Sequence, residues 1–515
     1  MRIGFKPPTY YSRSGNIDYL GCVNFIPELI PDGKGFVSLF GAPGTKLFAN
    51  FGSNVIRGAH VFNGLIYVVE GNQLYSVNGS GVISDPLGTL NTSSGRVEMK
   101  DNGLASSSIG GNQLMIVDEG YGYIYDVSTD TFSLISGGGW PSSNASNLTY
   151  LDGYFIVSVR GGMSFYVSDL YDGTTWNALA TSPVSASSDP IMALHDIHQQ
   201  LWIIKENTSE VWYDAGIPTS QGSPFLRISG GVIDYGTYAK WSVARGDNTL
   251  FMLGSQRNND MGQLVGVVRI VGYQAQVISP VAFNYKMRQF STVADAYGYC
   301  YSDEGHTYYV LTFPSGNWTI VYDCSTNLWH ERSSYSSPPY QINRHVGNCY
   351  IHYNGKHYVA DYRDGKVYEM ASTYYDDAGQ PLVSIAHFRL SDKEKAGNFS
   401  IRRLFIDAET GVGVTSVDFT PAINIDSPGE DIGFVEDVPT VLTDEDDPAA
   451  PVAYLSWSDD RGHKWSSDYE SSMGKAGEYN KRLLWRKLGY SPGDRIFRLQ
   501  VSDSVKRVLA AAYIE

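Results

Sequence analysis

The sequence predicts an all-β chain: a β-propeller of about seven, or six, four-stranded blades followed by a C-terminal β-sandwich-like domain. Glycine (54 residues) and tyrosine (37 residues) are both abundant among the 515 residues. Glycine-containing turns between aromatic and β-branched runs are typical of strands, because such side chains suit a pleated, half-buried surface. A hairpin pattern recurs through most of the chain, and its rhythm changes past about residue 375. We find no long amphipathic helical pattern.

The recurring unit has an apolar strand, a tight turn, an aromatic or aliphatic strand, a second turn and a third strand. Its first turns are anchored at Gly64, Gly111, Gly153, Gln199, Asn248, Gly305 and Gly355, so that the spacings are 47, 42, 46, 49, 57 and 50 residues. Several copies continue into a polar turn and a fourth strand. A four-stranded antiparallel unit that recurs about every 40–50 residues is the signature of a β-propeller.

The third strand of several copies ends in a Tyr-Asp pair, as at Tyr125-Asp126, Tyr213-Asp214 and Tyr322-Asp323. A propeller hides its terminal blades only when the ring closes, so a strand from outside the repeats is expected to complete it. We assign this closing strand to Gly35–Phe40. The predicted domains are an N-terminal arm over 1–34 and a propeller over 35–375.

The region 376–515 is predicted to form the sandwich domain, with strands over 401–409, 414–421, 453–460, 481–488, 495–503 and 506–514. An acidic insertion at about 421–451 interrupts it. From Leu404 to Asp460 there is no Lys or Arg, whereas fourteen Asp and Glu residues occur there. A solvated loop is the favoured interpretation. A partner-facing loop or a calcium site is the alternative, and the glycine-punctuated spacing of a calcium loop is missing.

The net charge of −16 and the sequence pI near 5.1 argue against a protein that grips nucleic acid, because phosphate contacts need clustered Lys and Arg. A wall along which DNA slides is still compatible with this charge. Cys22, Cys300, Cys324 and Cys349 show no metal-site spacing, and we expect free thiols in a reducing compartment. The N-terminus lacks an apolar targeting segment and no run is long enough to span a membrane, so a cytoplasmic protein is expected until it is assembled into a particle.

The strongest short motif is the Asp-box-like hairpin of Ser458, Asp460, Gly462 and Trp465, in which the Asp caps the turn, the Gly takes positive φ and the Trp packs beneath. It occurs once and is weak evidence for glycoside hydrolysis, which needs two converging carboxylates. No serine elbow, phosphate-binding loop or metalloprotease motif is present. His306 and His330 are interpreted as hydrogen-bonded structural histidines. We therefore predict no catalytic, cofactor-binding or metal-binding residues, and no enzyme.

Several long strings resemble the packaged-DNA stabilization, or tail hub (nozzle), proteins of short-tailed bacteriophages. They are GHTYYVLTFP at 305–314, LWHER at 328–332, ADYRDGKVY at 360–368, LSWSDD at 455–460, LWRKLG at 484–489 and FRLQVSD at 497–503. The resemblance is best over 230–370 and 453–515. The first 60 residues match loosely, and the acidic insertion is not covered.

This resemblance implies a structural virion protein at the head–tail connection, assembled in the host cytoplasm. It implies a homohexameric ring below the portal and adaptor that closes the channel, retains the packaged DNA and carries tail spikes or fibres, with a tail needle as a further partner in genome ejection. Contact with DNA would be transient and non-specific, so we expect an acidic or neutral channel surface. The alternatives are a glycan-binding or glycan-hydrolysing propeller of sialidase type and a monomeric protein-interaction propeller.

Overall fold

The computed structural model describes residues 19–30, 37–105, 110–141, 144–258, 261–336, 341–389, 399–412, 450–491 and 495–515, with three short pieces at 2–3, 5 and 10–11. The chain divides into two compact units. The propeller unit comprises Lys6–Pro27 and Ala42–Leu382, and the sandwich unit comprises Met1–Phe5, Glu28–Gly41 and Val383–Glu515. This division differs from the predicted arm over 1–34 and propeller over 35–375.

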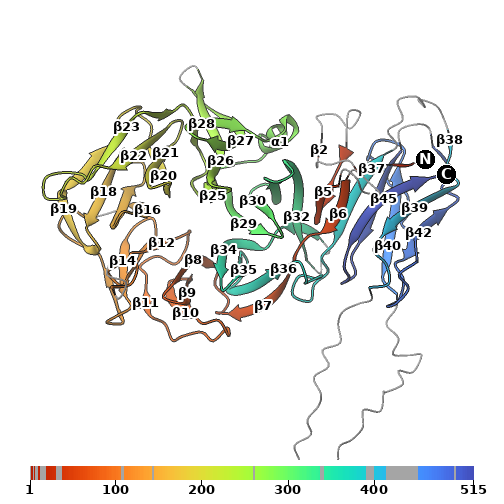
Figure 1. The fold of residues 1–515 in the computed structure, drawn as a ribbon, viewed down its shortest axis with the longest axis horizontal. Coiled ribbons are helices and arrows are strands. Elements are labelled where there is room, and N and C mark those ends of the chain that lie inside the picture. Colours follow the sequence, from red (N-terminus) through yellow and green to blue (C-terminus); the bar gives the residue numbers. More distant parts are fainter. Residues whose placement is uncertain are drawn as a thin grey trace, which may run out of the picture. The chain divides into compact units, whose positions relative to one another are not determined.

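Seven sheets follow one another in the described part of the propeller unit, and Figure 1 shows them as blades around a common centre. Blade 1 contains β8 (Ile56–Phe62), β9 (Leu65–Glu70), β10 (Gln73–Val77) and β11 (Gly88–Thr89). Blade 2 contains β12 (Glu98–Asp101), β13 (Gln113–Val117), β14 (Gly122–Asp126) and β15 (Thr131–Leu134). Blade 3 contains β16 (Ala145–Leu151), β17 (Tyr154–Val159), β18 (Ser164–Asp169) and β19 (Asp172–Pro183).

Blades 4 to 6 continue the same order along the chain. Blade 4 contains β20 (Ile191–Ile197), β21 (Gln200–Lys205), β22 (Ser209–Asp214) and β23 (Phe225–Ile233). Blade 5 contains β24 (Gly236–Thr237), β25 (Ala244–Gly246), β26 (Thr249–Asn258), β27 (Met261–Val271) and β28 (Gln274–Val277), with the 3-10 turn η2 (Lys240–Ser242) before β25. Blade 6 contains β29 (Tyr297–Asp303), β30 (His306–Phe313), β31 (Trp318–Asp323) and β32 (Leu328–Ser336), preceded by helix α1 (Val281–Met287) and followed by β33 (Gln341–Arg344).

Blade 7 is built from two distant parts of the chain. It contains β34 (Gly347–Tyr353), β35 (Lys356–Asp361) and β36 (Lys366–Ala371), and its fourth strand is β7 (Gly44–Asn50). β7 runs antiparallel to β36, from Lys366 opposite Asn50 to Ala371 opposite Gly44. The predicted blade number of seven is therefore confirmed in the described residues, and the ring closes as expected.

The predicted closing strand at 35–40 is wrong. That stretch forms β6 (Val37–Gly41), which pairs with β45 (Val508–Ile514) in the sandwich unit and buries Val37 and Leu39 there. The closing strand begins at Gly44, where a Cβ atom would lie 2.3 Å from the carbonyl oxygen of Asp376. Because only glycine fits so close to another backbone, Gly44 marks the point at which the chain enters the blade.

The predicted first turns have a shared geometry. In six blades a two-residue turn joins the first two strands, and both of its residues have positive φ, as in type I′ turns. These pairs are Asn63-Gly64, Asp152-Gly153, His198-Gln199, Asp247-Asn248, Glu304-Gly305 and Asn354-Gly355. In blade 2 a longer connection replaces the turn. The Tyr-Asp pairs also have a structural role, because Asp126, Asp214 and Asp323 each accept a hydrogen bond from the backbone N–H two residues later.

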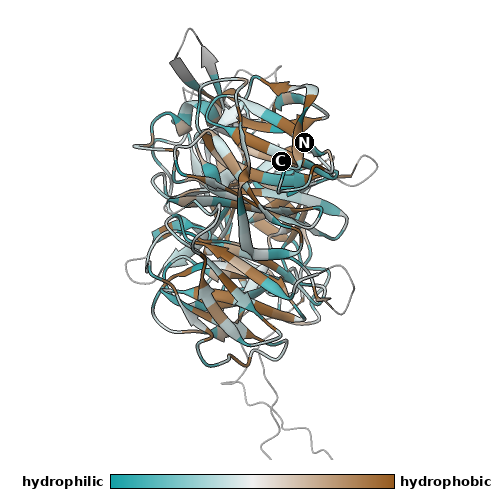
Figure 2. Cartoon of the chain, turned by 90° about the vertical axis from the view of Figure 1, so that its left-hand side faces the viewer, coloured by the Kyte–Doolittle hydropathy of each residue, from teal (hydrophilic) through white to brown (hydrophobic). Residues whose placement is uncertain are grey.

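The core of the propeller lies between its blades. Seven clusters of buried apolar residues occur in the described part of the unit, one between each pair of neighbouring blades, and the last joins blade 7 to blade 1. Between blades 5 and 6, for example, the rings of Phe251 and Tyr309 stack with centroids 5.1 Å apart. Figure 2 shows the apolar residues, in brown, on the strands. Each blade thus depends on both neighbours for its burial.

The sandwich unit has two main sheets in its described residues. One has the order β42 (Leu483–Arg486), β39 (Arg403–Ala408), β45 and β6, and β1 (Arg2–Ile3) also pairs with β45. The other has the order β37 (Ser384–Arg389), β44 (Ile496–Val501), β40 (Val452–Ser458) and β41 (Tyr469–Ser472). β38 (Phe399–Ser400) pairs with β43 (Tyr490–Ser491). Five of the predicted strands are confirmed, whereas 414–421 and nearly all of the acidic insertion at about 421–451 lie outside the described residues.

The remaining short strands belong to the N-terminal part of the chain. β2 (Tyr10–Tyr11) pairs with β3 (Tyr19–Leu20), β4 (Cys22–Val23) runs parallel to β32, and β5 spans Phe25–Leu29. The four cysteines form no disulfide within the described part of the chain. Burial raises the pKa of the Cys22 thiol well above its usual range. Within the described ranges, no helix is long and apolar enough to cross a membrane.

Candidate functional site: the axis of the propeller

The first strands of the blades surround the propeller axis. β8 contacts β12, β12 contacts β16 and β16 contacts β20, and the contacts continue through η2, β25, β29 and β34 back to β8. If this protein lets a polymer pass, the axis of a single propeller is the first passage to consider. Polar and charged side chains from these strands decide whether it is open.

Lys240 bridges the axis at one level. It lies in η2 of blade 5, and its Nζ atom is 3.5 Å from a carboxylate oxygen of Glu98 and 3.4 Å from one of Glu119, both in blade 2. The same ammonium group donates a hydrogen bond to the carbonyl oxygen of Ser146 in blade 3. Burial raises the pKa of Glu98. The charge of Lys240 and a hydrogen bond from the backbone N–H of Leu148 act in the opposite direction and lower it. Blades 2 and 5 stand on opposite sides of a seven-bladed ring, so this contact crosses its centre.

Arg96 makes a second crossing from the connection that leads into β12. Its guanidinium donates a hydrogen bond of 2.8 Å to the carbonyl oxygen of Asn348 in blade 7. The guanidinium carbon also lies 4.0 Å from the ring centre of Tyr297 in blade 6 and 5.7 Å from that of Trp241 beside blade 5. A cation over aromatic faces is attracted by their quadrupoles. One side chain thus joins four blades.

Asp196 lies at the end of β20 in blade 4, and its carboxylate contacts side chains of three other blades. One of its carboxylate oxygens lies 3.4 Å from Nζ of Lys100 in blade 2 and accepts a 3.1 Å hydrogen bond from Thr149 of blade 3. The other oxygen is 3.5 Å from the guanidinium of Arg245 in blade 5. Nearby, His60 and Asp101 join blades 1 and 2 at 2.7 Å.

The contacts of Lys240, Arg96 and Asp196 join side chains that belong to different blades. Among the residues named above, cations and carboxylates lie beside one another. The pairs of Lys240 are largely buried, so breaking them would be costly, whereas the pairs of Asp196 are partly exposed and contribute less. The arrangement therefore fixes the blades against one another across the axis.

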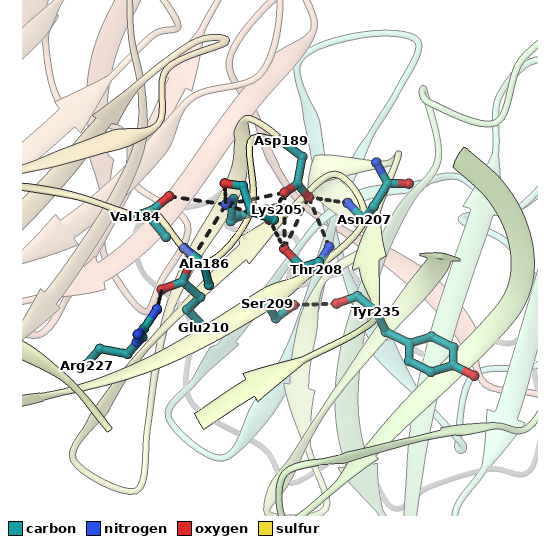
Figure 3. A network of polar contacts seen from close by, with 11 residues as sticks. Val184, Ala186, Asp189, Lys205, Asn207, Thr208, Ser209, Glu210, Arg227 and Tyr235 are labelled. Carbon is teal, nitrogen blue, oxygen red and sulfur yellow. Dashed lines mark hydrogen bonds and ion pairs between the residues drawn. The ribbon is translucent and has the colours of Figure 1, made fainter. Parts of the chain in front are cut away.

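A buried charge cluster in blade 4 also holds separate parts of the chain together (Figure 3). The side chain of Lys205 is fully buried, and its Nζ atom lies 3.3 Å from Asp189 and 3.7 Å from Glu210. It also donates hydrogen bonds to the carbonyl oxygens of Val184 and Ser187. Lys205 thereby holds the connection between blades 3 and 4.

Both carboxylates of this cluster are compensated. Burial acts to raise the pKa of Asp189, but hydrogen bonds from Ser187 and the Asn207 backbone, together with the charge of Lys205, lower it below its usual value. Glu210 accepts a hydrogen bond from the Ala186 backbone and lies 3.6 Å from the guanidinium of Arg227. Every charge of the cluster lies within 3.7 Å of an opposite charge.

The two predicted structural histidines differ. The prediction is confirmed for His306, whose Nδ1 lies 2.8 Å from a carboxylate oxygen of Asp323. It is wrong for His330, which is fully buried without a hydrogen-bond partner for either ring nitrogen among the described residues. Burial, followed by the charge of Arg332, keeps the pKa of His330 far below its usual value. This ring packs edge-on against Tyr308 with centroids 6.0 Å apart, so it behaves as an apolar core residue.

The Asp and the Gly of the Asp-box-like hairpin have the predicted geometry. It joins β40 to β41 in the sandwich unit, Asp460 accepts a 2.7 Å hydrogen bond from the Lys464 N–H, and Gly462 has a φ of 93°. Trp465 packs against the guanidinium of Arg498, which lies 4.6 Å from the ring centre. The motif is thus a turn. Over the described ranges, no three His, Cys, Asp or Glu side chains gather so that they could hold a metal ion.

Sequence reasoning missed the axial residues Arg96, Glu98 and Lys240. They occur at different positions of their blades and repeat in no other copy, so no periodic signal marks them. The Tyr-Asp pairs and the turn residues, by contrast, recur and were found.

Comparison with known families gives two matches. A family model described as the β-propeller of bacteriophage P22 Gp10 matches residues 14–375. A second model, described as the β-sandwich of the same protein, matches residues 434–515. No curated protein matches the chain.

Solved structures show low similarity. The WD40 domain of Pan2 from Neurospora crassa aligns with a TM-score of 0.40 at 10% identity, covering 64% of this chain and 95% of that one. The computationally designed protein Ika8 gives 0.36 at 9% identity, covering 63% and 99%. BamB from Moraxella catarrhalis gives 0.36 at 11% identity, covering 71% and 97%. Similarities at this level carry no argument about function.

Proposed function

Because this chain belongs to the family of bacteriophage P22 Gp10, the tail hub or packaged-DNA stabilization proteins of short-tailed phages, we propose that it forms the tail hub of such a phage. Membership makes it a structural protein of the phage tail and places it in the virion. The finer role that we propose is to close the channel below the head and to retain the packaged DNA until ejection.

The observation that carries this proposal is the paired match of the two family models. The first covers the propeller and the second covers the C-terminal strands of the sandwich unit, in the order of the family. A propeller match alone would be compatible with many functions, since one fold hosts many unrelated functions.

The bridged axis supports a particular way of building the channel. Since the contacts of Lys240 and Arg96 cross the centre of the propeller, we place the DNA passage between copies of the chain. We propose a homohexameric ring whose copies act as wall units, joined above to the portal and adaptor proteins. Tail spikes or fibres, and a tail needle, are the further partners that we propose on the family relationship.

The charge of the chain supports transient contact with DNA. At a net charge of −16, a channel surface drawn from this chain would be acidic or neutral, so DNA phosphates would be repelled instead of held. A continuous Lys and Arg stripe along the channel of the assembled ring would contradict this part of the proposal.

We favour no enzymatic role. The Asp-box-like hairpin, on which the sialidase-type alternative depended, lies in the sandwich unit and acts as a turn. A structural tail protein agrees with the family of the chain.

The direct test uses a phage whose copy of this gene carries a stop codon and is complemented from a plasmid. Without the protein, filled heads are expected to lose their DNA, so that the genome becomes sensitive to added nuclease. Complementation should restore both DNA retention and a ring below the portal in electron micrographs of the particles. Full DNA retention without the protein, or its absence from purified tails, would refute the proposal.

A further inference from the structure

A pocket of about 180 Å³ lies between blades 4 and 5, at the end of the propeller where the first turns are found. We propose that this pocket binds one neutral sugar unit. The site is separate from the Asp-box-like hairpin and does not depend on the proposed tail function.

Three turns and a core surface form the pocket. Its walls come from the first turns of the two blades, through His198 and Asn248, and from the turn that joins β27 to β28, through Tyr273. Its floor comes from the apolar cluster between the blades, which includes Ile197, Leu250 and Ile270. Since drug-sized ligands occupy pockets of about 300–1,000 Å³, this one suits a smaller ligand.

One exposed aromatic ring, which packs on a buried one, gives the pocket its binding surface. Tyr273 is 41% exposed and Trp202 is 4% exposed, with ring centroids 5.9 Å apart at an angle of 36°. The apolar C–H face of a sugar ring packs on an aromatic face in the same way as other flat apolar groups. The indole of Trp202, including its N–H, is buried, so the aromatic face that a ligand can reach belongs to Tyr273.

The rim is polar but carries no formal charge from Asp, Glu, Lys or Arg. The Gln200 amide donates a 2.9 Å hydrogen bond to the hydroxyl of Tyr273, and His198 Nε2 lies 2.9 Å from the side-chain oxygen of Asn248. Amide, imidazole and phenol groups can donate and accept hydrogen bonds, which suits the hydroxyls of a sugar. A phosphate or a carboxylate ligand would find no Lys or Arg among the lining residues.

The turns that border the pocket differ from those of the other blades. In blades 1, 3, 6 and 7 the second residue of the two-residue turn is Gly64, Gly153, Gly305 or Gly355, whereas blades 4 and 5 have Gln199 and Asn248 there. A non-glycine residue at positive φ is less favourable than glycine, although Asn tolerates this conformation better than most residues. Asn248 has this conformation, and its side chain lines the pocket. The departure from the repeat thus coincides with the pocket.

Binding is tested on the full chain by saturation-transfer NMR and calorimetry, with methyl glycosides of glucose, galactose and mannose and with N-acetylglucosamine. The Tyr273→Ala variant should bind the tightest-binding of these sugars about tenfold more weakly, as expected when a contact worth about 1.4 kcal/mol is lost. Gln200→Ala should also weaken binding, by a smaller factor. Tyr213→Ala is the matched control, because Tyr213 is equally exposed, at 42%, on blade 4 and does not line the pocket.

Two further arms separate the source and the class of ligand. Purified host lipopolysaccharide, added in place of free sugar, should bind through the same residues if the ligand is part of a bacterial surface. Glucuronic and N-acetylneuraminic acids should bind more weakly than neutral sugars. The proposal is overturned by no binding of any neutral sugar at millimolar concentration, by equal loss in Tyr213→Ala, or by equal binding of the acidic sugars. None of these outcomes bears on the nuclease test of DNA retention.

Discussion

The propeller and the sandwich are both β-sheet structures, but they are assembled from the sequence in opposite ways. In the propeller, nearly every strand pairs with the next strand along the chain, as where Phe62 faces Leu65 across a two-residue turn. In the sandwich, β45 at the C-terminus pairs with β39 and with β6. Leu509 of β45 lies opposite Leu39 of β6, hundreds of residues earlier in the sequence. Local pairing repeats in the sequence and can be found there, whereas long-range pairing leaves no such repeat.

The two units also treat buried charge differently. Lys205 in the propeller is paired with two carboxylates that are buried with it. Arg495 in the sandwich is 2% exposed, but its partner Asp459 is 37% exposed. Removing the cation therefore leaves buried charges in one unit and a hydrated charge in the other.

The largest effect is expected for Lys205→Met. The substitution leaves Asp189 buried without Lys205 and leaves Glu210 with only the partly exposed Arg227. It should lower the free energy of unfolding by about 3–5 kcal/mol. Hydrogen exchange measured by mass spectrometry should show faster exchange in peptides from blades 3 and 4. Lys366→Met is the control, because its pair with Asp364 is partly exposed and exposed pairs contribute little. Equal effects of the two variants would contradict the bracing role.

The next effect is a pH dependence of the propeller. Burial, followed by the charge of Lys100, lowers the pKa of His195 from 6.5 to about 4. Above pH 6.5 the ring is neutral in both states. Between pH 6.5 and 4 the unfolded chain binds a proton that the folded one does not, so stability falls by about 1.4 kcal/mol for each pH unit.

Thermal unfolding at pH 7 and pH 5 measures this difference, and His195→Gln should reduce it. Hydrogen exchange should show acid-induced opening around His195 and around the other buried histidines whose pKa is lowered, His330 and His345. Faster opening of the sandwich peptides over the same interval, with the propeller unchanged, would reverse the comparison.

A smaller effect is expected for Arg495→Met in the sandwich. The variant loses a two-point contact with Asp459, at 2.7 Å for each pair of atoms, and a hydrogen bond of 2.9 Å to the Tyr490 carbonyl oxygen. Because water can hydrate the carboxylate, we expect a loss of about 1–3 kcal/mol, confined to this unit. A shift in melting temperature as large as that of Lys205→Met would show that the stability lost with the cation does not depend on how exposed its carboxylate partner is.

The smallest effect is expected for Asp460→Ala. The turn between β40 and β41 would lose the acceptor of the Lys464 N–H, while the strands on both sides keep their pairing. A slight decrease in the melting temperature of the sandwich should result, with no change in the propeller. Asp460→Asn, which keeps an acceptor oxygen, should lie between the variant and the wild type.

Repetition explains how much of this fold could be predicted. The blade number, the turn pairs such as Asn63-Gly64 and the capping role of Asp323 follow from patterns that recur. The closing strand could not be placed, because β6 and β7 are both short apolar strands near the N-terminus and Gly44 alone separates their roles. At the axis, Lys240 and Glu98 come from blades that are far apart in sequence, so their pairing has no local signal. The ring of His330 has no partner because its place in the core depends on packing.

The composite seventh blade also sets the order in which the molecule can be completed. β7 leaves the ribosome early, yet its partner β36 begins at Lys366. At about 5–20 residues per second, this delay is on the order of half a minute. Through that interval the edge of β7 has no neighbour, and a newly made copy nearby offers the same unpaired β36. Correct closure therefore competes with exchange of β7 between nascent chains, most severely when many copies are made together.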